Sequence, residues 1–365
     1  MNIGVLYPRS KAHPGITQDF LEGMKSYFAI QENAPDFRII PESIGFGGSE
    51  KEVYEKAEKL LLIENVDVLV AYIGEKVIEL IQPLLQASGK LVIIVHPGAN
   101  YPGSWKSLPN TVYLTLQHAF LCWLTGKEAG EGNEKQAIVA STFYDCGYLH
   151  LARMVDGMTG KGGEIIFNYV NKSAYDNSFR ADELINFLDD ETNETNKILC
   201  LFDELPASLF YELLNKYEGA EALQLFVSPM MLEANALKDL QNGFTFSVSG
   251  YTSHRPKTGS LFSLLGWETG MILQQVKQMV MEKPGNGADH AASLCDIKFD
   301  SPRGEMILDP QTNYFITPVI HCAIRGNKKE LKAMPVDFSV NAWADYIQLP
   351  TDGYPSGWTN TYLCY

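Results

Sequence analysis

Short apolar runs alternate with longer stretches in which apolar residues recur every three or four positions. The apolar runs predict strands at residues 3–7, 37–41, 66–71 and 91–95. The stretches between them predict amphipathic helices at residues 15–31, 49–62 and 75–86. The last two strands are almost wholly aliphatic, as in a sheet that is covered on both faces. This alternation predicts a parallel α/β sheet.

The same pattern then starts again. Further strands are expected at residues 112–114, 136–141, 164–169, 197–202, 223–227 and 244–249. Helices are expected at residues 117–128, 148–158, 177–188, 207–217 and 259–281. Because 365 residues exceed what one hydrophobic core usually serves, the two series predict two parallel sheets in tandem. The alternating segments 296–299, 305–308 and 313–324 favour antiparallel hairpins, and the aromatic-rich end of the chain is expected to pack against the lobes.

Composition narrows the class of partner. The net charge of −15, with no cluster of Lys or Arg, argues against nucleic acid and anionic membranes, and favours a small molecule. No run of eighteen apolar residues occurs, so we expect no membrane insertion. The six cysteines form no CxxC pair and no spacing typical of metal ligands, so buried thiols are preferred over disulfides or a metal site. We expect no cofactor.

Several segments in order resemble the type I periplasmic binding proteins of branched-chain amino acid transporters. They are residues 3–10 followed by 18–24, residues 56–62 followed by 66–70, Ala99 after the strand at 91–95, residues 144–148, and residues 299–304 with 308–310. The resemblance covers about residues 2–325 and implies two Rossmann-like lobes, with helix-covered parallel sheets, that are joined by three hinge crossovers. It also implies a cleft that closes on a ligand.

The crossovers of that family would fall near residues 114–117, near residues 250–253 and close to Asp300. Lobe 1 would then hold residues 1–116 and 252–299, lobe 2 residues 117–251 and 300–340, and the tail residues 341–365. The resemblance further implies export to the periplasm or the cell exterior, with or without a lipid anchor, after removal of a leader. The partner it implies is the membrane permease of an ABC transporter.

Ligands of parallel α/β sheets rest outside the carboxyl ends of the strands, where loop amides and helix N-termini favour a carboxylate. The candidate ligand-binding residues are those that follow the expected strands: Ser10, Tyr72, Ile73, Gly74, His96, Gly98, Ala99, Asn100, Tyr144, Asp203, Glu204, Met230 and Tyr251. The resemblance implies that loops 72–74 and 98–100 hold a ligand carboxylate through main-chain N–H groups. It also implies that Tyr144 closes over the ligand from the other lobe.

This sequence departs from the family where specificity is decided. Tyr72-Ile73 and His96-Pro97 replace small hydroxyl residues, and residues 228–231 bring no acid for a ligand ammonium group. Asp203 or Glu204 would have to supply that acid, because a buried ammonium without a partner is costly. The expected ligand is an amino acid or related carboxylate, or a larger or aromatic solute.

Two other functions keep the α/β fold. A ligand-sensing receptor or regulator domain would show the same motifs. An enzyme would need chemistry that the sequence does not display, because residues 45–48 lack GxGxxG spacing and no P-loop, GxSxG or HExxH motif occurs. Cys146 and His150 are a thiol and a base only four positions apart, the one arrangement that suggests a nucleophile. We expect a binding protein and not an enzyme.

Overall fold

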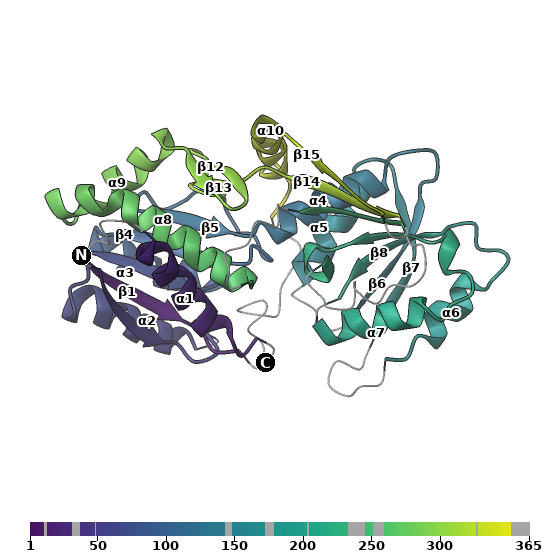
Figure 1. The fold of residues 1–365 in the computed structure, drawn as a ribbon, viewed down its shortest axis with the longest axis horizontal. Helices are drawn as coiled ribbons and strands as arrows, with labels where there is room; N and C mark the ends of the chain where they lie inside the picture. The colour runs from purple at the N-terminus through teal and green to yellow at the C-terminus, as the bar shows by residue number, and fades with distance from the viewer. Residues whose placement is uncertain are drawn as a thin grey trace. The chain divides into compact units, whose positions relative to one another are not determined.

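The structure, a computed structural model, describes residues 1–10, 13–30, 37–47, 49–142, 148–171, 179–202, 204–232, 245–250, 259–325 and 328–351. The chain forms two compact units, each with its own sheet and helices (Figure 1). Unit 1 contains residues 1–116, 252–318 and 336–365, and unit 2 contains residues 117–251 and 319–335. The predicted α/β class with two helix-covered parallel sheets is confirmed.

Unit 1 is built on a parallel sheet of five strands in the order β2-β1-β3-β4-β5. The strands are β1 (Asn2–Tyr7), β2 (Arg38–Ser43), β3 (Val68–Tyr72), β4 (Leu91–His96) and β5 (Thr111–Thr115). Strands β3, β4 and β5 are buried along their whole length, which explains their continuous aliphatic character.

Helices cover both faces of this sheet (Figure 1). They are α1 (Ile16–Ala29), α2 (Glu50–Glu58), which continues as the π-helix η1 (Lys59–Ile63), α3 (Glu75–Ser88), α8 (Leu261–Glu282) and α9 (Gly287–Ser293) with the 3-10 turn η5 (Leu294–Asp296). Helix α10 (Val336–Tyr346) also belongs to unit 1 and contacts the small sheet described below. The Ser49 hydroxyl accepts a hydrogen bond from the Glu52 amide and caps α2. Packing against Leu60 and Val66 places Gly4 on the α2 face, and contact with Phe20 places Tyr72 on the α1 face.

A small antiparallel sheet completes unit 1. Its strands are β11 (Phe299–Ser301), β12 (Gly304–Leu308) and β13 (Phe315–Ile316), and their pairing confirms the expected hairpins. The expected third crossover near Asp300 is wrong, because residues 300–318 pack with unit 1 and the chain leaves it only after Pro318. The chain then returns at Val336, so it passes between the units four times. Helix α10 consequently belongs to unit 1, and the expected tail boundary at residue 341 falls inside it.

Unit 2 has a mixed sheet in the order β15-β14-β10-β9-β8-β6-β7. Its strands are β6 (Gln136–Thr142), β7 (Glu164–Asn171), β8 (Lys197–Leu201), β9 (Gln224–Val227), β10 (Thr245–Gly250), β14 (Ile320–Arg325) and β15 (Lys328–Ala333). Strand β14 pairs antiparallel with both β10 and β15, and all other strand pairs of this sheet are parallel. The helices are α4 (His118–Ala129), α5 (Tyr148–Thr159), α6 (Asp182–Leu188) and α7 (Glu204–Leu214), with the 3-10 turns η2 (Ala220–Ala222) and η3 (Pro229–Leu232).

In each unit, one helix follows directly along the chain after the last parallel strand of the other unit. Helix α4 follows β5 of unit 1 but packs on α5 in unit 2, and α8 follows β10 of unit 2 but packs on α1 in unit 1. We call these two helix contacts the α1–α8 seam and the α4–α5 seam. A Cβ at Gly23 or Gly266 would lie 2.1 or 2.0 Å from a carbonyl oxygen across the first seam. At Gly126 or Gly157 the corresponding distances are 1.9 and 2.1 Å, so glycine lets both helix pairs approach closely.

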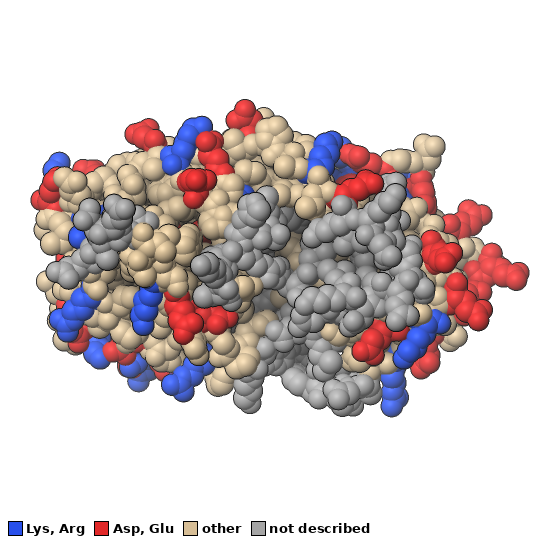
Figure 2. All heavy atoms as spheres, in the orientation of Figure 1, with Lys and Arg blue, Asp and Glu red and all other residues tan. Residues whose placement is uncertain are grey.

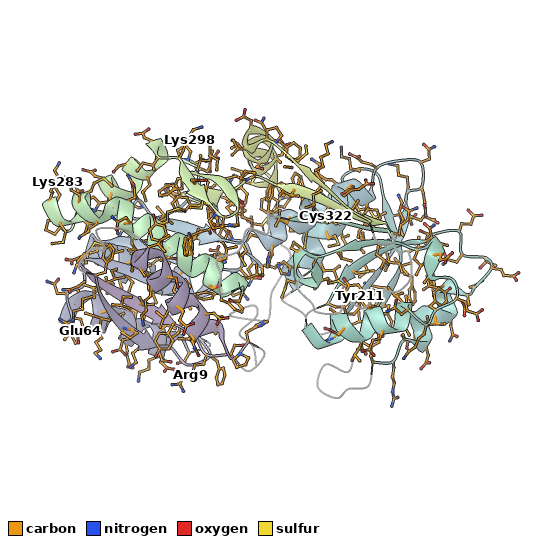
Figure 3. The ribbon with its side chains drawn as sticks, viewed as in Figure 1. Arg9, Glu64, Tyr211, Lys283, Lys298 and Cys322 are labelled. Carbon is orange, nitrogen blue, oxygen red and sulfur yellow. The ribbon has the colours of Figure 1, made fainter. Side chains whose placement is uncertain are left out.

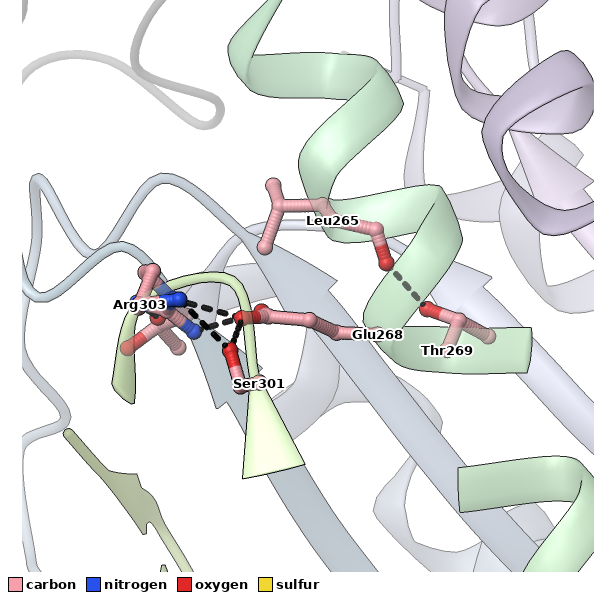
Figure 4. A network of polar contacts seen from close by, with 6 residues as sticks. Leu265, Glu268, Thr269, Ser301 and Arg303 are labelled. Atoms are coloured by element: carbon pink, nitrogen blue, oxygen red, sulfur yellow. Dashed lines mark hydrogen bonds and ion pairs between the residues drawn. The ribbon is translucent and has the colours of Figure 1, made fainter. Parts of the chain in front are cut away.

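A buried ion pair joins α8, the β11–β12 hairpin and the end of β5 (Figure 4). Arg303 Nε and Nη2 donate to the two Glu268 carboxylate oxygens over 2.9 and 2.7 Å, and Nη1 donates to the Thr115 carbonyl over 2.8 Å. The Ser301 hydroxyl donates to Glu268 and accepts from the Arg303 amide. Neither charged side chain is exposed to solvent.

Acidic side chains dominate the surface that Figure 2 shows at the end of unit 2, around α6. This segment carries Asp182 and Glu183 in the first turn of α6, and Asp189, Asp190 and Glu191 just beyond it. Of the described cysteines, Cys122, Cys200, Cys295 and Cys322 are free thiols, and all but Cys295 are buried. Burial raises the pKa of the Cys122 and Cys200 thiols, so both stay protonated and pack as small apolar groups.

Candidate functional site

The carboxyl ends of β3 and β4 carry the first part of the candidate site. His96 is the last residue of β4, and its Nδ1 accepts a hydrogen bond of 3.0 Å from the Gly98 amide. Gly98 has a φ of 73°, which favours glycine in this tight turn. The other ring nitrogen, Nε2, lies 3.0 Å from Glu75 Oε1, without the alignment of a well-formed hydrogen bond. Both side chains are buried, so one imidazole ring links the Gly98 amide to the first residue of α3.

Aromatic residues that lie far along the chain from Glu75 pack around its side chain. The Tyr314 hydroxyl donates a hydrogen bond to Glu75, and its ring stacks on Tyr113 with 4.5 Å between the ring centres. Burial is the main reason that the pKa of Tyr314 lies well above its ordinary value, with the Glu75 charge adding to it, so the hydroxyl keeps its proton. Trp105 and Trp343 pack around Tyr314, and Tyr346 of α10 packs on both tryptophans. The expectation that the aromatic tail packs therefore holds for these two α10 residues.

Tyr72 and His96 lie on opposite faces of the sheet. Register pairs Tyr72 with Val95 and His96 with Thr115, and neighbouring positions along a strand alternate in direction. The Tyr72 ring contacts Phe20 of α1 at 5.5 Å between ring centres, and its buried hydroxyl has no hydrogen-bond partner within the described ranges. Ile73 is fully buried. Gly74 is the N-cap of α3 in an extended conformation. Loop 72–74 is thus only partly polar.

The remaining candidates of unit 1 lie at the same edge. The Ser10 hydroxyl, after β1, accepts a hydrogen bond of 3.0 Å from the His13 amide and closes a turn ahead of α1. Ala99 is buried and Asn100 is partly exposed. Arg9, which precedes Ser10, is exposed to solvent (Figure 3). Strand order therefore places all the unit 1 candidates along one edge of the sheet, as predicted from the pattern.

In unit 2 the corresponding edge is formed by the ends of β6, β8 and β9. Met230 lies in the 3-10 turn η3 after β9 and is buried. The Tyr211 hydroxyl of α7 donates to the Met231 carbonyl over 3.2 Å and fixes this turn (Figure 3 labels Tyr211). Glu204 is the first residue of α7. Tyr144, Asp203 and Tyr251 lie outside the described residues, so their predicted roles stay predictions.

Several buried polar groups have no hydrogen-bond partner in the part of the chain described, and four of them lie at the carboxyl ends of strands. They are the hydroxyl of Tyr72, which sequence reasoning named, and the hydroxyls of Thr142 and Ser228 and the side-chain amide nitrogen of Gln117, which it missed. These residues end or follow β3, β6, β9 and β5, respectively. Gln117 is also held at a φ of 56°, which is unusual for a residue other than glycine. Buried polar groups normally find partners, so four unpartnered groups at strand ends indicate sites where a ligand or water binds.

The described residues show no arrangement typical of a metal centre or a thiol enzyme. Within them, no three His, Cys, Asp or Glu side chains are placed to hold a metal ion. Cys146 lies outside the described residues. His150 is fully buried, and burial lowers its pKa to about 3, which makes it a poor general base at neutral pH. No helix in the described ranges is long and apolar enough to cross a bilayer.

Solved structures share this fold. A benzoate-bound solute-binding protein of an ABC transporter from R. palustris covers 91% of this chain and 95% of its own, with a TM-score of 0.66 and 17% identity. A leucine-binding protein from Thermotoga maritima covers 92% and 99%, with a TM-score of 0.64 and 11% identity.

A third example is the isoleucine-bound substrate-binding protein of a branched-chain amino acid transporter from Streptococcus pneumoniae. It covers 92% of this chain and 99% of its own, with a TM-score of 0.63 and 12% identity. No protein-family model and no curated protein sequence matches. At these identities the likeness shows the fold, which is that of periplasmic solute-binding proteins.

Proposed function

We propose that this chain is an extracytoplasmic solute-binding protein that captures a small polar molecule, does not transform it, and delivers it to the permease of an ABC transporter. The shared fold supports this proposal, because the solved structures described above are solute-binding proteins, two of them with benzoate or isoleucine bound. The proposed location is the periplasm or the cell exterior.

One observation carries the proposal. Parallel strands of both units end in buried hydroxyls that have no hydrogen-bond partner among the described residues: Tyr72 in unit 1, and Thr142 and Ser228 in unit 2. An unpaired buried hydroxyl costs about 1–3 kcal/mol of stability, so its retention at strand ends favours a binding role. We propose that the solute engages the strand ends of both units, so that binding favours a closed state through contacts made to each.

The test separates a binding hydroxyl from a structural one. The protein is purified without denaturation, and methanol extraction followed by mass spectrometry identifies the solute retained. Tyr72→Phe should then leave the melting temperature unchanged or slightly higher, because an unsatisfied hydroxyl is removed. Its affinity for the extracted solute should fall about tenfold, which corresponds to about 1.4 kcal/mol.

Tyr169→Phe is the matched control. The Tyr169 hydroxyl donates to the Arg180 carbonyl over 2.6 Å, so its loss should lower the melting temperature without changing solute affinity. A Tyr72→Phe protein that loses stability as the control does, and binds the solute as the wild type does, would refute the assignment of Tyr72.

A further inference from the structure

The main-chain group expected to hold a ligand carboxylate is already engaged inside unit 1. The Gly98 N–H donates to His96 Nδ1 over 3.0 Å. An imidazole nitrogen that accepts a hydrogen bond carries no proton, so His96 is in its neutral form with the proton on Nε2. Nε2 itself lies 3.0 Å from Glu75 Oε1. The loop after β4 therefore offers its glycine amide to its own histidine instead of to a solute.

A negative charge occupies the start of α3, where a helix otherwise attracts anions. Glu75 is the first residue of α3, is 4% exposed, and receives the Tyr314 hydroxyl as a hydrogen-bond donor. Its Oε1 accepts the hydrogen bond from the Tyr314 hydroxyl and lies 3.0 Å from His96 Nε2. The partial positive charge of the helix end is thereby satisfied within the protein.

Further negative charge lies nearby. Tyr113 is buried in the same cluster, and burial is the larger cause of its raised pKa, with the charges of Glu75 and Glu79 adding to it. A solute carboxylate placed at the Gly74 and Gly98 loops would sit beside the buried Glu75 charge, and like charges in a poorly solvated site repel strongly. The two loops that the family resemblance assigned to a carboxylate are therefore unsuited to one in this chain.

From these contacts we propose that the solute presents an uncharged hydrogen-bonding group, and not a carboxylate, to the carboxyl edge of the unit 1 sheet. This inference rests on the proposed function and narrows its ligand class. The Tyr72 hydroxyl fits it, because this group is neutral, buried, and without a hydrogen-bond partner among the described residues. Such groups bind amide, hydroxyl or carbonyl functions without requiring a counter-charge. Glu75 is the specificity-determining residue, acting by repulsion.

Matched acids and amides test the proposal directly. Isothermal titration of the whole protein at neutral pH compares benzoate with benzamide, and 4-methylpentanoate with 4-methylpentanamide. Within each pair the size and shape are nearly the same and only the charge differs. The amide of at least one pair should bind at least about tenfold more tightly than its acid.

Glu75→Gln removes the charge and keeps the shape. In this variant the affinity for the acid should rise about tenfold, while the affinity for the amide should change less than about threefold. Glu79→Gln is the control, because Glu79 lies one turn further along α3 and is exposed, so water screens its charge. The two variants should therefore differ in acid binding.

The outcomes distinguish the inference from the proposed function. A wild-type protein that binds the acid of a pair more tightly than the amide would overturn the inference and leave solute binding intact. If none of the four probes binds, the solute recovered by extraction decides, and one whose only polar group is a carboxylate overturns the inference. Absence of any retained solute together with no binding by wild type or Glu75→Gln would reject both.

Discussion

The buried Glu268–Arg303 pair of unit 1 is compensated within the protein. Arg303 donates two hydrogen bonds to the Glu268 carboxylate (Figure 4). Arg303 also donates to the Thr115 carbonyl, and Glu268 accepts a further hydrogen bond from the Ser301 hydroxyl. Such a pair adds little net stability compared with apolar residues of the same size, but loss of one member leaves an uncompensated buried charge. The pair therefore serves mainly to hold α8, the β11–β12 hairpin and the end of β5 in a fixed arrangement.

Arg303→Met should lower the free energy of unfolding by about 3–5 kcal/mol, because Glu268 would remain buried without its cation. The double variant Arg303→Met with Glu268→Leu should lose clearly less than the sum of the two single variants. Urea denaturation followed by circular dichroism measures both.

The exposed pair Lys298–Glu305 spans the same hairpin and provides the comparison, with side chains 70% and 41% exposed. Lys298→Ala should change stability by less than about 1 kcal/mol. Equal losses from Lys298→Ala and Arg303→Met would show that burial is not the cause.

At single residues the sequence predicted position better than chemistry. Counting strands placed Gly74, His96 and Gly98 at the carboxyl edge, since that depends only on periodicity. The Glu75–Tyr314 hydrogen bond joins residues 239 positions apart, so no local sequence pattern predicts it. In the sequence, Arg303 stood out only as a member of the family-like segment 299–304, and its buried ion pair depends on Glu268 of α8. Tertiary partners such as these are not specified by spacing.

At the scale of elements, the buried strands of unit 1 and most helices were predictable because their burial leaves a clear period. Helix α9 was missed because its segment is rich in Gly, Asn and Pro, which are typical of loops. Gly287 opens that helix, and a Cβ there would lie 2.4 Å from the Lys90 carbonyl carbon, so close packing on β4 overrides local preference. Strand β15 carries three lysines and one exposed leucine, which conceals its pairing at the sheet edge.

The α4–α5 seam gives the prediction at this scale. Gly126→Ala and Gly157→Ala should each destabilise the protein by about 1–3 kcal/mol, because the new Cβ meets a carbonyl oxygen of the partner helix. This opposes the gain of about 1 kcal/mol that alanine normally brings to a helix interior. Thermal unfolding monitored at 222 nm would measure the loss.

Gly15→Ala is the control, since an added Cβ there would have its nearest neighbour at 3.5 Å. Its stability should stay within about 0.5 kcal/mol of the wild type. Seam variants as stable as Gly15→Ala would mean that the helices move apart without cost, contrary to close packing.

At the scale of the whole molecule, neither unit is a continuous segment of chain. Unit 1 is assembled from three stretches and unit 2 from two. The first stretch, residues 1–116, contains all five strands of its sheet but lacks α8, the partner of α1. Family likeness predicted crossovers, whereas the extent of each stretch depends on where β13 and α10 pack, which the sequence did not reveal.

A fragment of residues 1–130 should therefore fail to fold as a stable monomer, because the apolar face of α1 that includes Phe20 and Met24 would be left in water. Sedimentation velocity should show association or aggregation, and urea unfolding should lack a cooperative transition. A monomeric fragment that unfolds cooperatively with near-native stability would contradict the view that α8 completes this unit.

The exchanged helices have a consequence for the independence of the two units. A chain with only one sheet and the helix that follows its fifth strand would leave its own first helix uncovered. Neither half is therefore complete without a segment that the chain supplies from beyond the other unit's strands. Glycines on both helices of each seam permit the close contact that completes each unit.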